Sequence, residues 1–209
     1  MTVSRAVAGG TGRNVTLITN GPELKAGTIE AMGDSVVLRA AVGAITDGNS
    51  GANNIKTKSL VALAASGIDL DTDVDNVTAV TSGTGAITID EANALTLKSV
   101  SSANGLIRVN AGGPLTATSV VGRAAGSSVV LGTSAGDLGV NLIQATGGTV
   151  QLSAAGAITD LNGAANNITA ANLTVLTATG IGTAADPLEV MVGALDTAGV
   201  TGPVFIIRL

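Results

Sequence analysis

The sequence predicts an all-β protein that winds into a β-solenoid of roughly ten coils. Three observations predict this fold: short segments in which apolar and polar residues alternate, an almost complete absence of aromatic side chains, and a long internal repeat. Together they favour a narrow and regular interior over the thick, irregular core of a globular domain.

Short segments rich in Val, Ile, Leu and Thr recur along the whole chain. Most of them alternate apolar with polar or small residues, which is the period-two pattern of a strand with one buried face. Clusters of Gly, Asn, Ser and Asp separate the segments, and no window shows a helical period of useful length. The expected strands are residues 14–19, 35–40, 59–65, 85–90, 94–100, 105–111, 115–121, 128–132, 149–155, 173–179 and 204–209.

The hydrophobic residues of this chain are small. They make up 45% of the 209 residues, yet Phe205 is the one aromatic residue, and Trp, Tyr, His and Cys do not occur. Aromatic rings normally supply much of the buried area of a globular core. In a column of stacked coils, Ala, Val, Leu, Ile and Thr suffice, because like side chains stack on like. A β-sandwich is the alternative fold, but it would normally need aromatic bulk between its sheets.

The composition also argues against several classes of function. The net charge is −5 and the ten basic residues are scattered, whereas nucleic-acid binding needs clustered Lys and Arg. No run reaches the ~18 apolar residues of a membrane-spanning helix, and the first residues lack the apolar core of a signal peptide. The absence of cysteine excludes a disulfide scaffold and thiolate zinc sites. We therefore expect no nucleic-acid partner and no membrane insertion.

A long repeat organises the chain. Residues 43–70 return as residues 156–183, an offset of 156 − 43 = 113 residues, and fifteen of the 28 aligned positions are identical. We expect one solenoid rod over residues 1–209, with a first copy at about 27–113 and an incomplete second copy at about 141–209. Strand segments about ten residues apart suggest coils of ~20 residues, so ten coils would make a rod ~50 Å long. The incomplete second copy suggests a segment of a longer array.

The repeat also carries a family resemblance. The succession GAITD…ANNI…L..L.A.GI…DPLEVMVGAL…TGPVFI, over residues 156–206, resembles the repeats of filamentous-haemagglutinin-like giant bacterial exoproteins and related adhesins. The first copy shares the pattern over residues 43–89, and the GI…DPLE element and the final strand are its distinctive parts. The resemblance implies a right-handed parallel β-helix that is secreted to the bacterial cell surface. It also implies a role in adhesion to a host or cell-surface ligand, or in holding an adhesive tip outward.

One stretch, residues 67–77, places an aspartate at every second position: Asp69, Asp71, Asp73 and Asp75, here called the acidic row. On a strand these side chains would point to one side, ~6.6 Å apart, and would diverge from the common centre that calcium requires. The spacing does not fit an EF-hand loop. We interpret the row as the solvated face of a strand, with a loose surface calcium site as a weaker alternative and catalysis as the least favoured one. In an ungapped alignment with the second copy, the row meets, in order, Gly182, Ala184, Asp186 and Leu188.

Other candidate sites are weak. The chain has no His, and seven acidic residues outside the row resemble corner and loop residues: Asp34, Asp47, Asp90, Glu91, Asp137, Asp160 and Asp196. We therefore expect neither an enzyme nor a cofactor, calcium apart. The Asn pairs at 53–54 and 166–167 should cap turns through side-chain hydrogen bonds. Asn-X-Thr triplets that could accept glycans arise readily by chance in a chain so rich in Asn and Thr; they begin at Asn14, Asn76, Asn167 and Asn172.

The function that we expect from these observations is structural: a stalk or repeat segment of a secreted bacterial surface adhesin, contacting neighbouring coils or subunits of its own kind. The alternative is a fibre subunit that stacks head to tail, because a solenoid exposes open strand edges at its ends. The last strand would then supply the assembly edge, with Phe205, Ile206, Ile207 and Leu209. A polysaccharide-active β-helix enzyme is the least favoured function.

Overall fold

The computed structural model describes residues 1–10 and 12–209, and in this part of the chain every regular element is a β-strand. The strands are β1 Thr2–Val7, β2 Val15–Thr19, β3 Glu23–Ala40, β4 Ala44–Asp47, β5 Ile55–Ala64, β6 Ile68–Thr84, β7 Ile87–Glu91, β8 Leu95–Asn104, β9 Ile107–Ala111, β10 Leu115–Ala117, β11 Val120–Gly122, β12 Val129–Thr133, β13 Leu138–Val140, β14 Ile143–Ser153, β15 Ile158–Asp160, β16 Ile168–Thr177, β17 Leu188–Asp196 and β18 Ile206–Arg208.

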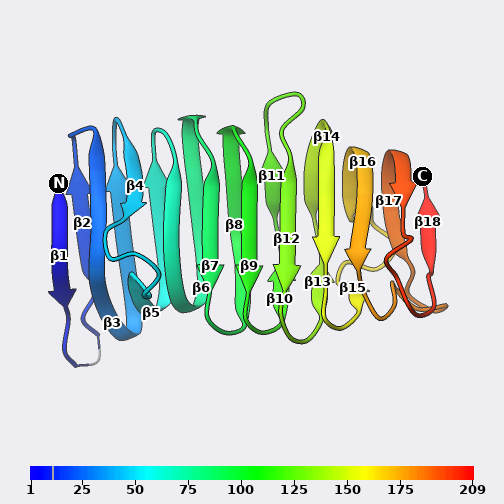
Figure 1. Ribbon diagram of the computed structural model, residues 1–209, viewed down its shortest axis with the longest axis horizontal. Helices are drawn as coiled ribbons and strands as arrows, with labels where there is room; N and C mark the ends of the chain where they lie inside the picture. The colour runs from blue at the N-terminus through cyan, green and yellow to red at the C-terminus, as the bar shows by residue number, and fades with distance from the viewer. Residues whose placement is uncertain (11) are drawn as a thin grey trace.

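These strands form a β-solenoid of about ten turns, which confirms the predicted fold. The pairings are parallel and join each turn to the next, as in β3 with β5, β5 with β6, and β6 with β8. Figure 1 shows the turns side by side along the long axis, with the two chain termini at opposite ends of the molecule. The β-sandwich alternative is excluded, because a sandwich packs two sheets of mainly antiparallel strands face to face.

A single column of inward side chains shows how the turns stack. Residues 24, 45, 68, 87 and 107 pair in register, and the column continues through 129, 150, 173 and 195. Every member is Leu, Ile or Val, and all except Leu195, which is 37% exposed at the end of the column, are at most 1% exposed. Like side chains therefore stack on like, as the composition predicted.

Long strands bend around the corners of the solenoid. The first half of β3 pairs with β1 and its second half pairs with β2, so one strand covers two faces. At Gly33, between the two halves, the backbone has φ +82°, which a residue with a side chain rarely adopts. The segment expected at residues 35–40 is thus only the end of a much longer strand.

Glycine also permits close approach between turns. A Cβ atom on Gly43 would lie 1.7 Å from the carbonyl oxygen of Pro22 in the preceding turn. No other residue fits there without moving one turn away from the other, because the clash is with backbone. Gly43, the first residue of the segment 43–70 that recurs as 156–183, therefore has a packing role at a corner.

Glu91 lies inside the solenoid, which was not expected. The sequence suggested a corner or loop residue, but Glu91 ends β7 with its side chain only 5% exposed. Its Oε2 accepts hydrogen bonds from the Thr72 hydroxyl (2.7 Å) and the Val74 N–H (3.0 Å), and its Oε1 accepts one from the Asn93 N–H (3.0 Å). Burial raises the pKa of this carboxyl, and the hydrogen bonds lower it by less, so the pKa is raised overall. The bonds explain how the acidic side chain is tolerated inside the solenoid.

The column predicts a clear contrast between the two sides of one strand. We expect Ile87→Ala to lower the free energy of unfolding by about 2–5 kcal/mol, because it removes buried apolar contacts and leaves a cavity. Thr88→Ala, the next residue and on the outer side, should change it by less than about 0.5 kcal/mol. Urea unfolding followed by circular dichroism measures both, and equal losses would contradict the stacked interior.

Candidate functional site

The acidic row lies on β6, and its four aspartates point outward. Asp69 and Asp75 are exposed, and Asp71 and Asp73 are half-buried. The residues between them, Ile68, Leu70, Thr72 and Val74, are all buried. The strand and its alternation are therefore as the sequence predicted.

The surroundings of the row differ from one aspartate to the next. Asp71 lies directly opposite Asp90 of β7, whereas Asp69 lies opposite Thr88. Asp73 lies opposite Lys56 of β5 and accepts a hydrogen bond from the Asn93 side chain (3.0 Å). Among residues 1–10 and 12–209, no three acidic side chains converge as a metal site would require. Calcium at this row stays a prediction.

Repulsion is concentrated in the first half of the row. Burial raises the pKa of Asp69 and of Asp71, and the charges of Asp47 and Asp90 raise both further. Asp47 behaves in the opposite way. Burial opposes its charged form, but hydrogen bonds from the Asn54 side chain and from nearby N–H groups outweigh burial and lower its pKa. This part of the surface is therefore an acidic face whose charges are only partly neutralised.

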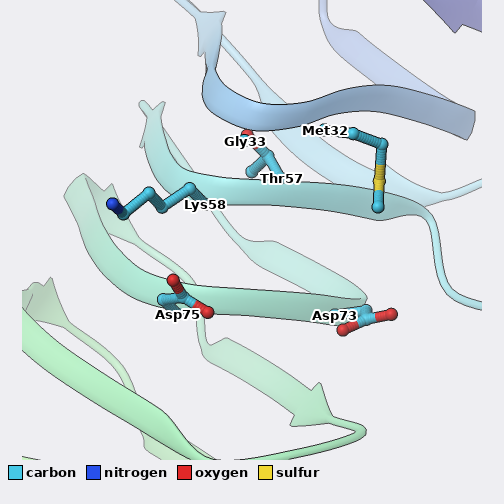
Figure 2. A pocket seen from close by; sticks show the side chains of 6 residues that line it. All are labelled: Met32, Gly33, Thr57, Lys58, Asp73 and Asp75. Atoms are coloured by element: carbon cyan, nitrogen blue, oxygen red, sulfur yellow. The ribbon is translucent and has the colours of Figure 1, made fainter. Parts of the chain in front are cut away.

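A shallow pocket lies over the second half of the row. Figure 2 shows side chains from three successive turns around it, with Lys58 on the strand next to that of Asp73 and Asp75. The lining residues are Met32, Gly33, Thr57, Lys58, Asp73 and Asp75. One ammonium group and two carboxylates in an open hollow make a polar surface of mixed charge.

The buried asparagines Asn54 and Asn167 make more side-chain hydrogen bonds than the turn caps that the sequence predicted. The Asn54 side chain is fully buried: its Nδ2 donates to the Ala26 carbonyl of the preceding turn (2.9 Å), and its Oδ1 accepts from the Asp71 N–H of the following turn (2.9 Å). Asn167 does the same in the second copy, donating to the Val140 carbonyl (2.9 Å) and accepting from the Glu189 N–H (2.8 Å). The predicted side-chain to backbone bonds exist, but they join three turns. The adjacent, less buried Asn of each pair does not make this link.

The structure also corrects the alignment of the two copies. Ile45 pairs with Ile68, and Ile158 with Ile181, as the 113-residue offset requires. However, Asp71 donates its N–H to Asn54, and the residue that does so for Asn167 is Glu189, not Ala184. Glu189 follows Ile181 by eight residues (189 − 181), whereas Asp71 follows Ile68 by three (71 − 68). The second copy therefore has five extra residues between these positions. The counterpart of Asp71 in the second copy is thus Glu189, which is also acidic.

The C-terminal edge is an apolar end of the solenoid. Here β18 pairs with β17 through Leu188↔Ile206, Glu189↔Ile207 and Val190↔Arg208. Of the predicted edge residues, Ile206 packs partly against the core, whereas Phe205, Ile207 and Leu209 are 38%, 45% and 59% exposed. The structure thus places three of these four side chains largely in solvent.

The N-terminal end is similar. Val3, Ala6, Val15 and Leu17 pack against the core of the second turn but are only partly buried, because they form the outermost layer. Val15 lies on Val36 and Leu17 on Leu38, both of which are fully buried. Both end turns therefore expose part of the interior cross-section, at the C-terminal end through Val200 and Ile206, whereas Phe205, Ile207 and Leu209 lie on the outer side of β18.

The chain matches no known family model, no curated protein and no solved structure. Within residues 1–10 and 12–209, no helix is long and apolar enough to cross a membrane.

The buried asparagines predict a local loss of protection. We expect Asn54→Ala to cost about 2–4 kcal/mol, because it leaves the Ala26 carbonyl and the Asp71 N–H buried without partners. Hydrogen exchange should show faster exchange at the Asp71 amide. Asn53→Ala is the matched control, since its side chain is less buried and lacks these bonds. Equal effects of the two substitutions would refute the role of Asn54.

The acidic face predicts a pH dependence. Because the pKa of Asp71 in the folded state is raised above its ordinary value of 3.8, this group lowers stability as the pH rises through that raised pKa. Asp71→Asn should therefore stabilise the chain at pH 7 by less than about 1 kcal/mol, and the gain should vanish below pH 3.8. Thermal unfolding at several pH values measures it. The gain should also shrink in 1 M NaCl; an effect that is independent of pH and salt would contradict the repulsion.

Proposed function

We propose that the chain is a rigid stalk segment of a secreted bacterial surface adhesin. The observation that carries the proposal is the unbroken interior column from Leu24 to Leu195. A column of this kind can be extended by adding turns without changing the fold. The family resemblance of residues 156–206 agrees with this function.

The mechanism is geometric. Each turn is tied to the next by parallel backbone hydrogen bonds, and Asn54 and Asn167 each add side-chain links among three turns. Bending the rod would stretch these bonds on one side and compress packed side chains on the other. A stalk built in this way holds a binding tip at a fixed distance from the cell. Strong binding contacts usually depend on Trp, Tyr and Arg. The chain has neither Trp nor Tyr, so its outer faces suit a spacer better than a binding tip.

A second candidate function is a fibre subunit that stacks head to tail. The observation in its favour is that both end turns expose part of the interior cross-section: Val3, Ala6, Val15 and Leu17 at one end, and Val200 and Ile206 at the other. Parallel pairing between β18 and β1 of a second copy would continue the solenoid. An enzyme acting on polysaccharides has less support, because sugar clefts commonly offer aromatic faces and the one ring here, Phe205, lies in the last turn.

The stalk proposal predicts a surface location without adhesion. Antibodies against residues 1–209 should label intact cells that produce the parent protein, whereas beads coated with the purified chain should not adhere to host cells or matrix. Labelling only after permeabilisation would contradict the surface location. Bead adhesion would place the binding function in this segment and contradict its role as a spacer.

The fibre alternative predicts filaments that grow with protein concentration in electron micrographs. Ile206→Asp should then abolish them, because Ile206 faces the core in the end turn and a charge there would be buried at the joint. Met32→Asp is the control, since Met32 is 66% exposed on the side of the rod. Short single rods at all concentrations would exclude the fibre and leave the stalk.

A further inference from the structure

Three buried oxygen atoms without hydrogen-bond partners belong to residues that are bonded to or adjacent to one residue of the second copy, Asn167. In the described part of the chain, the buried side-chain atoms that lack a partner are Ser127 Oγ, Asp160 Oδ2, Asn166 Oδ1 and Glu189 Oε2. The last three belong to residues next to or bonded to Asn167. Buried polar atoms are nearly always satisfied in native proteins, so three together call for a physical explanation.

Asn167 is hydrogen-bonded to both acidic residues. Its Nδ2 donates to Asp160 Oδ1 (2.5 Å), and its Oδ1 accepts from the Glu189 N–H (2.8 Å). Asp160 is 7% exposed and Glu189 is 4% exposed. Two carboxylates so deeply buried, with an unpaired oxygen on each, are costly unless a positive charge compensates them.

The counterpart of Asp160 in the first copy, Asp47, is half-buried and accepts hydrogen bonds from backbone N–H groups. In the loop of residues 47–54, Asp47 Oδ1 accepts from the N–H groups of Asn49 (2.7 Å) and Ser50 (3.1 Å). Ser50 and Gly51 both have a left-handed backbone, at φ 52° and 76°. This conformation directs successive N–H groups toward an anion, and these hydrogen bonds, together with one from the Asn54 side chain, lower the pKa of Asp47.

The second copy lacks that arrangement. In the loop of residues 160–167, the backbone is left-handed at Gly163 but not at Ala164, which is the counterpart of Gly51 (51 + 113 = 164). Asp160 Oδ1 accepts from the Asn162 N–H (2.8 Å), and the Oδ2 atom accepts from nothing. An acidic pair is thus present in both copies, Asp47 with Asp71 and Asp160 with Glu189, but the hydrogen bond from the Ser50 N–H to Asp47 has no counterpart in the second.

We propose that the second copy binds a calcium ion through Asp160 Oδ2, Glu189 Oε2 and Asn166 Oδ1. Carboxylate and amide oxygens are the ligands that calcium prefers, and the ion accepts irregular geometry with water in the remaining positions. Its charge would balance the two carboxylates. Bound there, the ion would link the second loop to β17 in the next turn and would fix the five-residue insertion of residues 182–186 that precedes this strand.

Calorimetric titration of the full chain with CaCl₂ tests the proposal, together with thermal unfolding in CaCl₂ and in EDTA. We expect one calcium ion per chain and a higher melting temperature in CaCl₂. Asp160→Asn and Glu189→Gln should each weaken binding at least tenfold. Asp47→Asn is the matched control, because it makes the same change at the equivalent position of the first copy and should leave the affinity unchanged.

Several results would overturn the proposal. They are a wild-type chain that shows neither binding heat nor a change in melting temperature, an Asp47→Asn variant that loses as much affinity as Asp160→Asn, and equal binding of Mg²⁺, which would indicate diffuse screening of the acidic surface. If Asp160→Asn fails to fold, Asn166→Ala provides the test, since it removes one ligand and leaves both carboxylates in place.

Discussion

In-register stacking of successive turns is the constraint on which the rest of this structure depends. Parallel pairing sets neighbouring turns ~4.8 Å apart, so each inward side chain lies directly on its counterpart in the turns before and after it. The column through Ile45, Ile68, Ile87 and Ile107 shows the result. Side chains of similar size and shape fit such a column, so small branched residues fill the interior without any aromatic ring.

The same constraint explains where polar groups occur inside. A corner interrupts the ladder of backbone hydrogen bonds, and a side chain must then replace the missing partner. Asn54 and Asn167 do this with one amide each, donating to the turn before and accepting from the turn after. Glu91 does it with a carboxylate that accepts three hydrogen bonds. The interior is therefore apolar along its faces and specifically hydrogen-bonded at its corners.

Much of the fold could be predicted from the sequence because a strand imposes a period of two. The alternation of Ile68, Leu70, Thr72 and Val74 with the acidic row identified both the strand and its buried side. The alignment of the copies beyond Ile181 was wrong, because residues 182–186 form an insertion that only the pairing of β16 with β17 reveals. Local pattern also could not show that Glu91 lies inside, since its burial depends on Thr72 and Val74 of the preceding turn. For the same reason, the pairing of Asp160 with Glu189 could not be predicted from the sequence.

Distances along the rod test stacking most directly. The chain has no cysteine, so Lys25→Cys can be spin-labelled together with Arg108→Cys, Gln151→Cys or Asp196→Cys. Each of these residues follows a member of the column that runs from Leu24 to Leu195. Four, six and eight turns of ~4.8 Å place the partners ~19, ~29 and ~38 Å away. Stacking predicts narrow distance distributions that increase linearly with the number of turns. Distances that reach a plateau, or that decrease for the most distant pair, would contradict the solenoid.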